Sequence, residues 1–187
     1  MKEENCIVLD FLASGYADRR RSESIAQAIG TSFFSLLEVI PREGIALKSG
    51  EEAYIGDGKR DKVRFIRGQI DFSHLTNLAQ SELPQVVEDI IKKNEQRFVE
   101  FFNKSGMISL RMHQLQLLPG IGKKHLLDIL DERKKKPFES FADITERGKL
   151  PDPMKAVVHR VMDELKGKEK YYLFVRHRKI IEERYYS

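Results

Sequence analysis

The run Leu-Leu-Pro-Gly-Ile-Gly-Lys-Lys at residues 117–124 constrains the fold more than any other part of this chain. Gly120 and Gly122 bracket a single apolar residue, Ile121, so the backbone can turn sharply there at little steric cost. Apolar residues at helical spacing follow the run, and we expect a short helix over residues 109–117 before it. The sequence therefore predicts a tight hairpin between two helices, with Ile121 pointing inward.

The start of the second helix of this hairpin has the features of an anion site. The first backbone N–H groups of a helix have no partner within it, and the helix dipole places partial positive charge there. Lys123 and Lys124 add two full charges at the same place. The alternative is a purely structural turn, but this combination favours phosphate binding. The predicted contact residues are Leu118, Gly120, Ile121, Gly122, Lys123 and Lys124.

The charge of the chain is uneven along its length. Its net charge is +4, with a pI of about 9.1. Residues 1–75 carry 11 basic and 12 acidic side chains, whereas residues 76–187 carry 22 and 17. The basic excess lies with the hairpin and favours a polyanionic partner there, with an affinity that falls as salt rises.

The composition excludes a membrane-spanning protein. No apolar run approaches the roughly 20 residues that a membrane span requires. The first residues are polar and acidic, without the basic and then apolar order of a secretory signal. We therefore expect a cytoplasmic protein with no membrane partner.

No catalytic or metal-binding motif stands out. Cys6 is the single cysteine, so neither an internal disulfide nor a cysteine zinc site is expected. The histidines lie at no ligand spacing, and no catalytic triad, phosphate loop or dinucleotide motif is present. We expect no cofactor, no metal and no catalytic residue.

Short runs rich in β-branched and aromatic residues occupy the first part of the chain and predict strands. A polar loop at residues 57–61 separates the last two runs and predicts a hairpin. Ile25, Ala26 and Ile29 lie at helical spacing and predict a short helix over residues 22–29. The predicted strands are residues 7–12, 33–40, 52–56 and 63–70.

The middle of the chain is predicted to be helical. A long helix begins at a capping Ser81 and ends near residue 105, with Pro84 in its first turn, where proline is tolerated. We interpret it as a connector. After Pro137 the pattern of helix, turn and helix returns. The predicted helices of this second pair are residues 138–144 and 154–165.

Residues 107–166 resemble the tandem helix-hairpin-helix domain, in which two stacked hairpins bury a common core. This resemblance implies binding to nucleic-acid backbones without sequence reading. The second hairpin has one glycine and two prolines in place of the glycine pair, so we expect it to pack without binding phosphate. The matching residues are 118–122, Ile129, Arg133, Pro137, Phe138 and Phe141.

Residues 170–176 have the pattern of a strand, which needs a sheet to join. Added to the four N-terminal strands, it would complete a five-stranded sheet that resembles the OB barrel, whose face often binds nucleic acids. The predicted fold class is therefore α+β, with a small OB-like β-barrel and an all-α tandem helix-hairpin-helix domain. The predicted parts are a β domain at 1–75 with 170–180 as its added strand, a connector at 76–106, the hairpin domain at 107–166, and a C-terminal strand and tail at 167–187.

Further basic and aromatic residues are candidates for secondary contacts with nucleic acid. Those in the β domain would flank its binding face or stack on bases beside Phe65. The alternatives are solvated loop arginines, a Phe65 in the core, and a helix end at residues 133–136 whose cations offset the helix dipole. The candidates are Arg19, Arg20, Arg21, Tyr54, Arg64, Arg67, Arg133 and Lys134.

Over nearly its full length the chain resembles an archaeal family of unknown function, described as nucleotide- or RNA-binding, that joins an OB-like domain to a helix-hairpin-helix region. The resemblance implies nucleic-acid binding and names neither a substrate nor a reaction. Its most specific stretches are residues 54–56, 60–63, 94–103 and 117–124.

We therefore expect a protein that binds the phosphate backbone of RNA or DNA without catalysis and with little sequence preference. A protein-interaction or assembly module of ribosomal or repair machinery is the alternative. A nuclease or nucleotide-processing enzyme is a third reading, which would need acidic side chains that converge in the structure.

Overall fold

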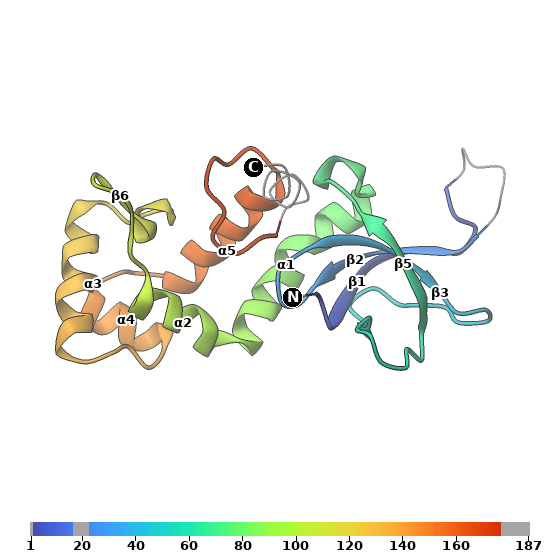
Figure 1. Ribbon diagram of the computed structural model, residues 1–187, viewed down its shortest axis with the longest axis horizontal. Coiled ribbons are helices and arrows are strands. Elements are labelled where there is room, and N and C mark those ends of the chain that lie inside the picture. Colours follow the sequence, from blue (N-terminus) through green and yellow to red (C-terminus); the bar gives the residue numbers. More distant parts are fainter. Residues whose placement is uncertain (1, 17–22, 177–187) are drawn as a thin grey trace. The chain divides into compact units, whose positions relative to one another are not determined.

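The computed structural model describes residues 2–16 and 23–176 (Figure 1). The chain divides into two compact units. Unit 1 contains Met1–Val86 and Asp163–Ser187, and unit 2 contains Val87–Met162. In the described part of the chain, no helix is long and apolar enough to cross a membrane.

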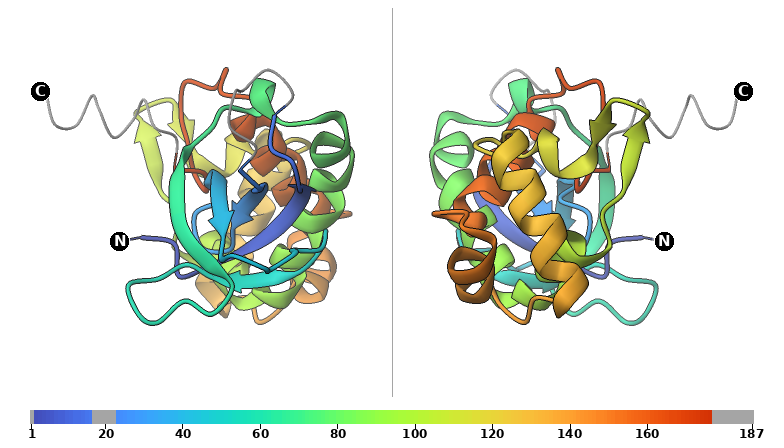
Figure 2. Two further views of the ribbon diagram at one scale, coloured as in Figure 1. Left: turned by 90° about the vertical axis from the view of Figure 1, so that its right-hand side faces the viewer. Right: turned by 90° about the vertical axis from the view of Figure 1, so that its left-hand side faces the viewer.

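Unit 1 is built on one antiparallel sheet of five strands that curls into a half-barrel (Figure 2, left). The strand order is β4-β1-β2-β3-β5, so β4 and β5 form its two edges. The strands are β1 (Asn5–Leu12), β2 (Ile25–Gly30), β3 (Leu36–Pro41), β4 (Glu52–Tyr54) and β5 (Val63–Gln69).

One face of this sheet carries an apolar core. Cys6 and Val8 of β1 are fully buried there with residues from every other strand, including Leu37, Val39 and Val63. Burial raises the pKa of the Cys6 thiol to about 12, so this side chain packs as a small apolar group.

The helix predicted over residues 22–29 is wrong, because Ile25–Gly30 forms strand β2. All six residues are buried, since β2 pairs with β1 and β3 and is covered on both faces. A strand buried on both faces shows no alternation of polar and apolar residues. Its apolar spacing therefore coincided with that of a helix.

The strand predicted over residues 170–176 is also wrong. These residues form no strand, and their backbone is held by the buried carboxylate of Glu164. The N–H groups of Leu173, Phe174 and Val175 donate to it over 2.7, 2.9 and 2.9 Å. The rest of the predicted 170–180 strand lies outside the described residues, and the fifth strand of the sheet is β2.

The single connector helix predicted from Ser81 is instead two helices, α1 (Asn77–Lys93) and α2 (Glu95–Lys104), which follow the 3-10 turn η1 (Phe72–His74). Thr76 caps α1, because its Oγ1 accepts from the N–H of Ala79 at 3.1 Å. The helix is interrupted at Asn94, whose φ of −119° and ψ of 31° are not helical. Its side-chain amide donates to the carbonyl of Ile90 at 2.8 Å.

In unit 2, a short β-hairpin precedes the loop that leads to α3. The helix predicted over residues 109–117 is wrong, because this segment contains β6 (Met107–Ser109), β7 (Met112–His113) and the 3-10 helix η2 (Gln114–Leu117). The hydrogen bonds of His113 favour the short 3-10 helix over a longer α-helix here. The Nδ1 of His113 accepts from the N–H of Leu115, while the Gln116 side chain accepts from the N–H of His113, and this capping box closes a short turn.

The remaining helices of unit 2 follow the expected order, and α5 ends in unit 1. Gly148 allows close packing between α3 and α4, since a Cβ there would lie 3.1 Å from a side-chain atom of Ile129. Ser140 starts α4 by accepting from the N–H of Asp143, so this helix begins later than predicted. The helices are α3 (Lys123–Lys135), α4 (Phe141–Gly148) and α5 (Pro153–Leu165).

Candidate nucleic-acid interface

The loop that joins η2 to α3 is a tight turn with a buried underside. The N–H of Ile121 donates to the carbonyl of Leu118 at 3.2 Å, and Gly120 has φ +86°, which is typical of a type II turn after Pro119. Leu118 and Ile121 are buried, so the expected inward direction of Ile121 is confirmed. The Arg160 guanidinium supports the loop by donating to the carbonyl of Leu117 at 3.4 Å.

The start of α3 has no capping side chain. Gly122 is the N-cap residue, in extended conformation, and no acidic residue lies in the first turn. Within the described part of the chain, the N–H groups of Lys123, Lys124 and His125 donate to no acceptor. Three amide donors and the positive end of the helix dipole therefore remain available to an anion.

The space around these amides is open. A Cβ built at Gly120 or at Gly122 would meet nothing within 4 Å. Lys123 and Lys124 are exposed, and neither forms an ion pair with a described residue. A phosphate oxygen can therefore approach the backbone while both ammonium groups reach the same anion.

The hairpin β6–β7 and η2 fix the position of this loop. Figure 1 shows β6 and the start of α3 at the same end of unit 2, and η2 contacts both β7 and α3. Burial, together with the positive charge of Arg133, lowers the pKa of His113, so its imidazole is neutral and its Nδ1 can accept a hydrogen bond. The capping box thus holds η2 at neutral pH.

The structure gives Arg133 a structural position. Its Nη1 donates to the carbonyls of Phe102 and Ser105, both at 2.9 Å, and burial lowers the pKa of the guanidinium. Lys134 forms an exposed ion pair with Asp131 at 3.5 Å. These two candidates lie at the C-terminal end of α3, about 15 Å along the helix from Lys123. They therefore belong to a different surface from the loop.

The candidates in unit 1 do not form one cluster. Tyr54 lies on β4, where its hydroxyl accepts from the N–H of Gly58, whereas Arg64 and Arg67 lie on β5, the opposite edge of the sheet. Arg64 lies over the ring of Phe65 at 5.5 Å, and 39% of Phe65 is exposed, which excludes the core alternative for this ring. Arg67 pairs with Glu38 at 3.7 Å. The predicted contacts Arg19, Arg20 and Arg21 lie outside the described residues.

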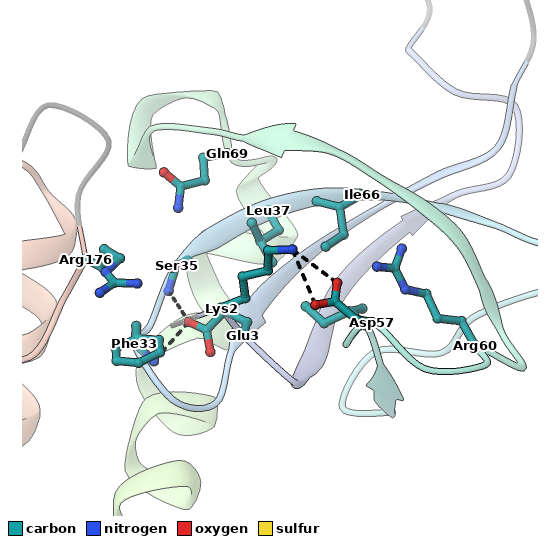
Figure 3. Close-up of a pocket in the computed structure, with 11 residues that line it drawn as sticks. Lys2, Glu3, Phe33, Ser35, Leu37, Asp57, Arg60, Ile66, Gln69 and Arg176 are labelled. Atoms are coloured by element: carbon teal, nitrogen blue, oxygen red, sulfur yellow. Dashed lines mark hydrogen bonds and ion pairs between the residues drawn. The ribbon is translucent and has the colours of Figure 1, made fainter. Parts of the chain in front are cut away.

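One concave site in unit 1 was not predicted from the sequence. It is a cavity of about 330 Å³ beside the β2–β3 turn (Figure 3). Its basic side chains, Lys2, Arg60 and Arg176, are far apart in the chain and form no motif. Only the sheet topology brings them together.

Proteins of two archaea are similar to this chain in sequence, and one of them in fold. A family model described as a protein of unknown function, DUF655, matches residues 2–176. The uncharacterized protein MJ0038 of Methanocaldococcus jannaschii is 45% identical over 175 residues, which cover 92% of this chain and 79% of that protein. The crystal structure of Af1531 from Archaeoglobus fulgidus, of the same family model, has a TM-score of 0.83 and 44% identity, and covers 93% of this chain and 100% of that one. The chain belongs to the DUF655 family.

Proposed function

We propose that this protein binds the phosphate backbone of RNA or DNA, without catalysis, at the loop before α3. The observation that carries the proposal is the uncapped start of this helix, where three unpartnered amides meet two exposed lysines. Such contacts recognise a phosphate group and do not contact the bases, so binding would show little sequence preference.

A comparison within unit 2 supports this assignment. Residues 107–166 resemble the tandem helix-hairpin-helix pattern in sequence, and a second turn precedes α5. There, Asp152 already places a carboxylate on the helix start, because its Oδ1 accepts from the N–H of Lys155 at 2.8 Å. A side-chain anion thus satisfies the second helix start, while the first is left open for an anion from outside.

Unit 1 would add affinity for single strands. A curled antiparallel sheet of five strands is the framework of the OB fold. On β5, Arg64 and the exposed ring of Phe65 offer a cation beside an aromatic surface on which a base can stack. Because one hairpin neutralises few phosphates, a second contact of this kind would raise a weak, salt-sensitive affinity.

The test is a pair of substitutions at Gly122. Gly122→Asp places a carboxylate on the helix start, as Asp152 does at α5, and Gly122→Asn supplies a neutral cap of the same size. Both side chains have open space and an unstrained backbone, so both variants keep the fold. Fluorescence anisotropy with single- and double-stranded RNA and DNA of 20 nucleotides measures the affinity.

We expect Gly122→Asp to weaken binding about tenfold, because the carboxylate repels the phosphate and occupies its donors, and Gly122→Asn to weaken it much less. The double variant Lys123→Gln/Lys124→Gln should also lose affinity. Its matched control, Lys134→Gln/Lys135→Gln, removes the same charge from the other end of α3. Equal affinities across these four variants would refute the proposal.

Protein interaction is the second candidate function, and the tip of the β6–β7 hairpin favours it. Leu110 is fully exposed there, together with 60% of Met107 and 36% of Met112. Exposed methionine and leucine side chains are common on protein-binding surfaces. Replacing Met107 and Leu110 with serine should release co-purifying proteins after nuclease treatment if this candidate is correct, and should leave them bound if it is not.

A further inference from the structure

The cavity in unit 1 has an apolar floor that continues the core of the sheet. Leu37 and Ile55 of the floor belong to the buried core, and Ile66 packs against it (Figure 3). A volume of about 330 Å³ is within the range of small-ligand sites in proteins. The floor offers a water-poor surface to one flat group of a ligand.

A β-bulge brings a polar side chain onto the same face. Val39 of β3 pairs with Ile66 of β5, and Leu37 pairs with Gln69, so two steps along β3 correspond to three along β5. Without this extra residue, Ile66 and Gln69 would point to opposite faces of the sheet. With it, both line the cavity, where the Gln69 amide supplies a donor beside an acceptor.

Two arginines lie at opposite ends of the cavity (Figure 3). The Nε of Arg60 donates to the carbonyl of Gly56 at 2.8 Å, which anchors the side chain, and its terminal nitrogens donate to none of the described residues. Arg176 stacks on the ring of Phe33 at 4.6 Å. One end therefore offers a bidentate donor for a phosphate, and the other a flat cationic wall.

The acidic side chains of the cavity do not cancel these charges. The carboxylate of Glu3 accepts from the N–H groups of Ser32, Phe33 and Ser35, at 2.8 to 3.2 Å. Asp57 pairs with Lys2 at 3.2 Å, and both side chains are about three-quarters exposed. Such an exposed pair contributes little energy, so it can open for a ligand.

We propose that this cavity binds one nucleotide unit. The base lies on Leu37, Ile55 and Ile66, its polar edge is hydrogen-bonded by Gln69, and its phosphate is held by Arg60. The apolar floor and the amide match a base, which has apolar faces and carries donors and acceptors on one edge. The unit is either a free mononucleotide or the terminal nucleotide of a strand. The cavity shares no residue with the loop before α3 or with Arg64 and Phe65, so it is a separate site from the contacts of the proposed function.

Isothermal titration calorimetry tests the proposal in the Gly122→Asp protein, in which binding at the loop before α3 is weakened. The probes are adenosine 5′-monophosphate, uridine 5′-monophosphate, adenosine, inorganic phosphate, and a hexanucleotide with or without a 5′ phosphate. The variants are Arg60→Gln and Gln69→Ala. Lys48→Gln is the control, because it removes the same charge from an exposed position of unit 1 outside the cavity. Circular dichroism checks the fold of each variant.

We expect a mononucleotide to bind at least about tenfold more tightly than adenosine or phosphate alone, with a loss of about tenfold in Arg60→Gln and in Gln69→Ala and no loss in Lys48→Gln. Equal affinity for the free nucleotide and the phosphorylated hexanucleotide assigns a free nucleotide, and preference for the hexanucleotide assigns a strand end. Phosphate binding as tight as nucleotide binding, or binding unaffected by Arg60→Gln and Gln69→Ala, would overturn the proposal. Failure here leaves the anisotropy test of the α3 loop unaffected.

Discussion

At the scale of single residues, two helix starts of unit 2 show how one side chain decides whether a backbone site is open. Gly122 leaves the first amides of α3 without an acceptor, whereas Asp152 caps α5 through the N–H of Lys155. Both turns lead into an α-helix of 13 residues. Their chemistry differs because a glycine brings no acceptor and an aspartate brings an anion.

Gly120→Ala should destabilise the protein by about 1 kcal/mol, because φ +86° is unfavourable for a residue with a Cβ although the space around it is open. Gly106→Ala is the control, since Gly106 also has open space but no positive φ. Urea denaturation measures the free energy of unfolding of both variants. A Gly120→Ala variant as stable as Gly106→Ala would contradict the strained turn.

The ion pair between Asp143 and Arg147 should make stability depend on acid pH. The hydrogen bond from Arg147 is the main reason that the pKa of Asp143 lies at about 2, below its ordinary value of 3.8. A lowered folded-state pKa stabilises the fold above about pH 4, and this contribution is lost as the pH falls toward 2. Asp143→Asn should cost about 1 kcal/mol at pH 6 and flatten the stability profile between pH 4 and 2. An unchanged profile in thermal unfolding would exclude this role.

At the scale of elements, long-range side-chain bonds join segments that local sequence leaves separate. Arg133 of α3 donates hydrogen bonds to the last turn of α2 and to the residue that follows this helix, through the carbonyls of Phe102 and Ser105. The carboxylate of Glu3 accepts hydrogen bonds from the N–H groups of the β2–β3 turn, and that of Glu164 accepts them from residues 173–175. Each charged group is stabilised by several backbone partners, as buried ions require.

Arg133→Met should destabilise the protein by about 2–3 kcal/mol, because the change leaves two carbonyls without their donor while keeping most of the side-chain volume. Lys134→Met removes a charge from the exposed neighbour and should change the stability by less than about 0.5 kcal/mol. Chemical denaturation compares the free energies of unfolding of the two variants. Equal stabilities would show that the Arg133 bonds are not formed in solution.

Glu164→Gln should loosen residues 173–175. An amide has one carbonyl oxygen in place of the two carboxylate oxygens that accept three N–H groups here. Hydrogen exchange at Leu173, Phe174 and Val175 should accelerate about tenfold. Asp163→Asn removes only an exposed ion pair with Lys166 and should leave the exchange of these three amides unchanged. Equal exchange rates in both variants would contradict the hydrogen bonds from residues 173–175 to Glu164.

At the scale of the whole molecule, the net charge of +4 matters less than its location. The basic excess belongs to residues 76–187, and much of it is paired locally, as in Lys135 with Glu132 and Lys136 with Glu139. Lys123 and Lys124 have no such partner among the described residues. Two exposed cations at the loop before α3 are therefore available to attract a polyanion.

Binding to double-stranded DNA should fall with salt with a log–log slope of about −2, because two lysines release about two counterions. Lys123→Gln/Lys124→Gln should bring this slope closer to zero by 1 to 2 units. Anisotropy titrations between 50 and 300 mM salt measure it. An unchanged slope would place the phosphate contacts elsewhere in the molecule.

Local patterns carried the successful predictions. The turn at Pro119, Gly120 and Ile121 depends on neighbouring residues, and the sequence alone located it, with Ile121 inward. The last helix, α5, was expected from periodicity to within a residue. The predictions for residues 22–29 and 109–117 were wrong, because a doubly covered strand has no alternation and a His113 capping box has no simple sequence signal.

The sequence by itself determined the turn before α3, its two lysines and the absence of an acidic cap, because these depend on residues a few positions apart. Only the tertiary structure decided that Arg133 is a structural residue and that Arg60, Gln69 and Arg176 line one cavity. Those contacts join residues tens of positions apart, so they form only when the sheet curls and the helices pack. Burial and pairing then select which basic side chains remain available for a ligand.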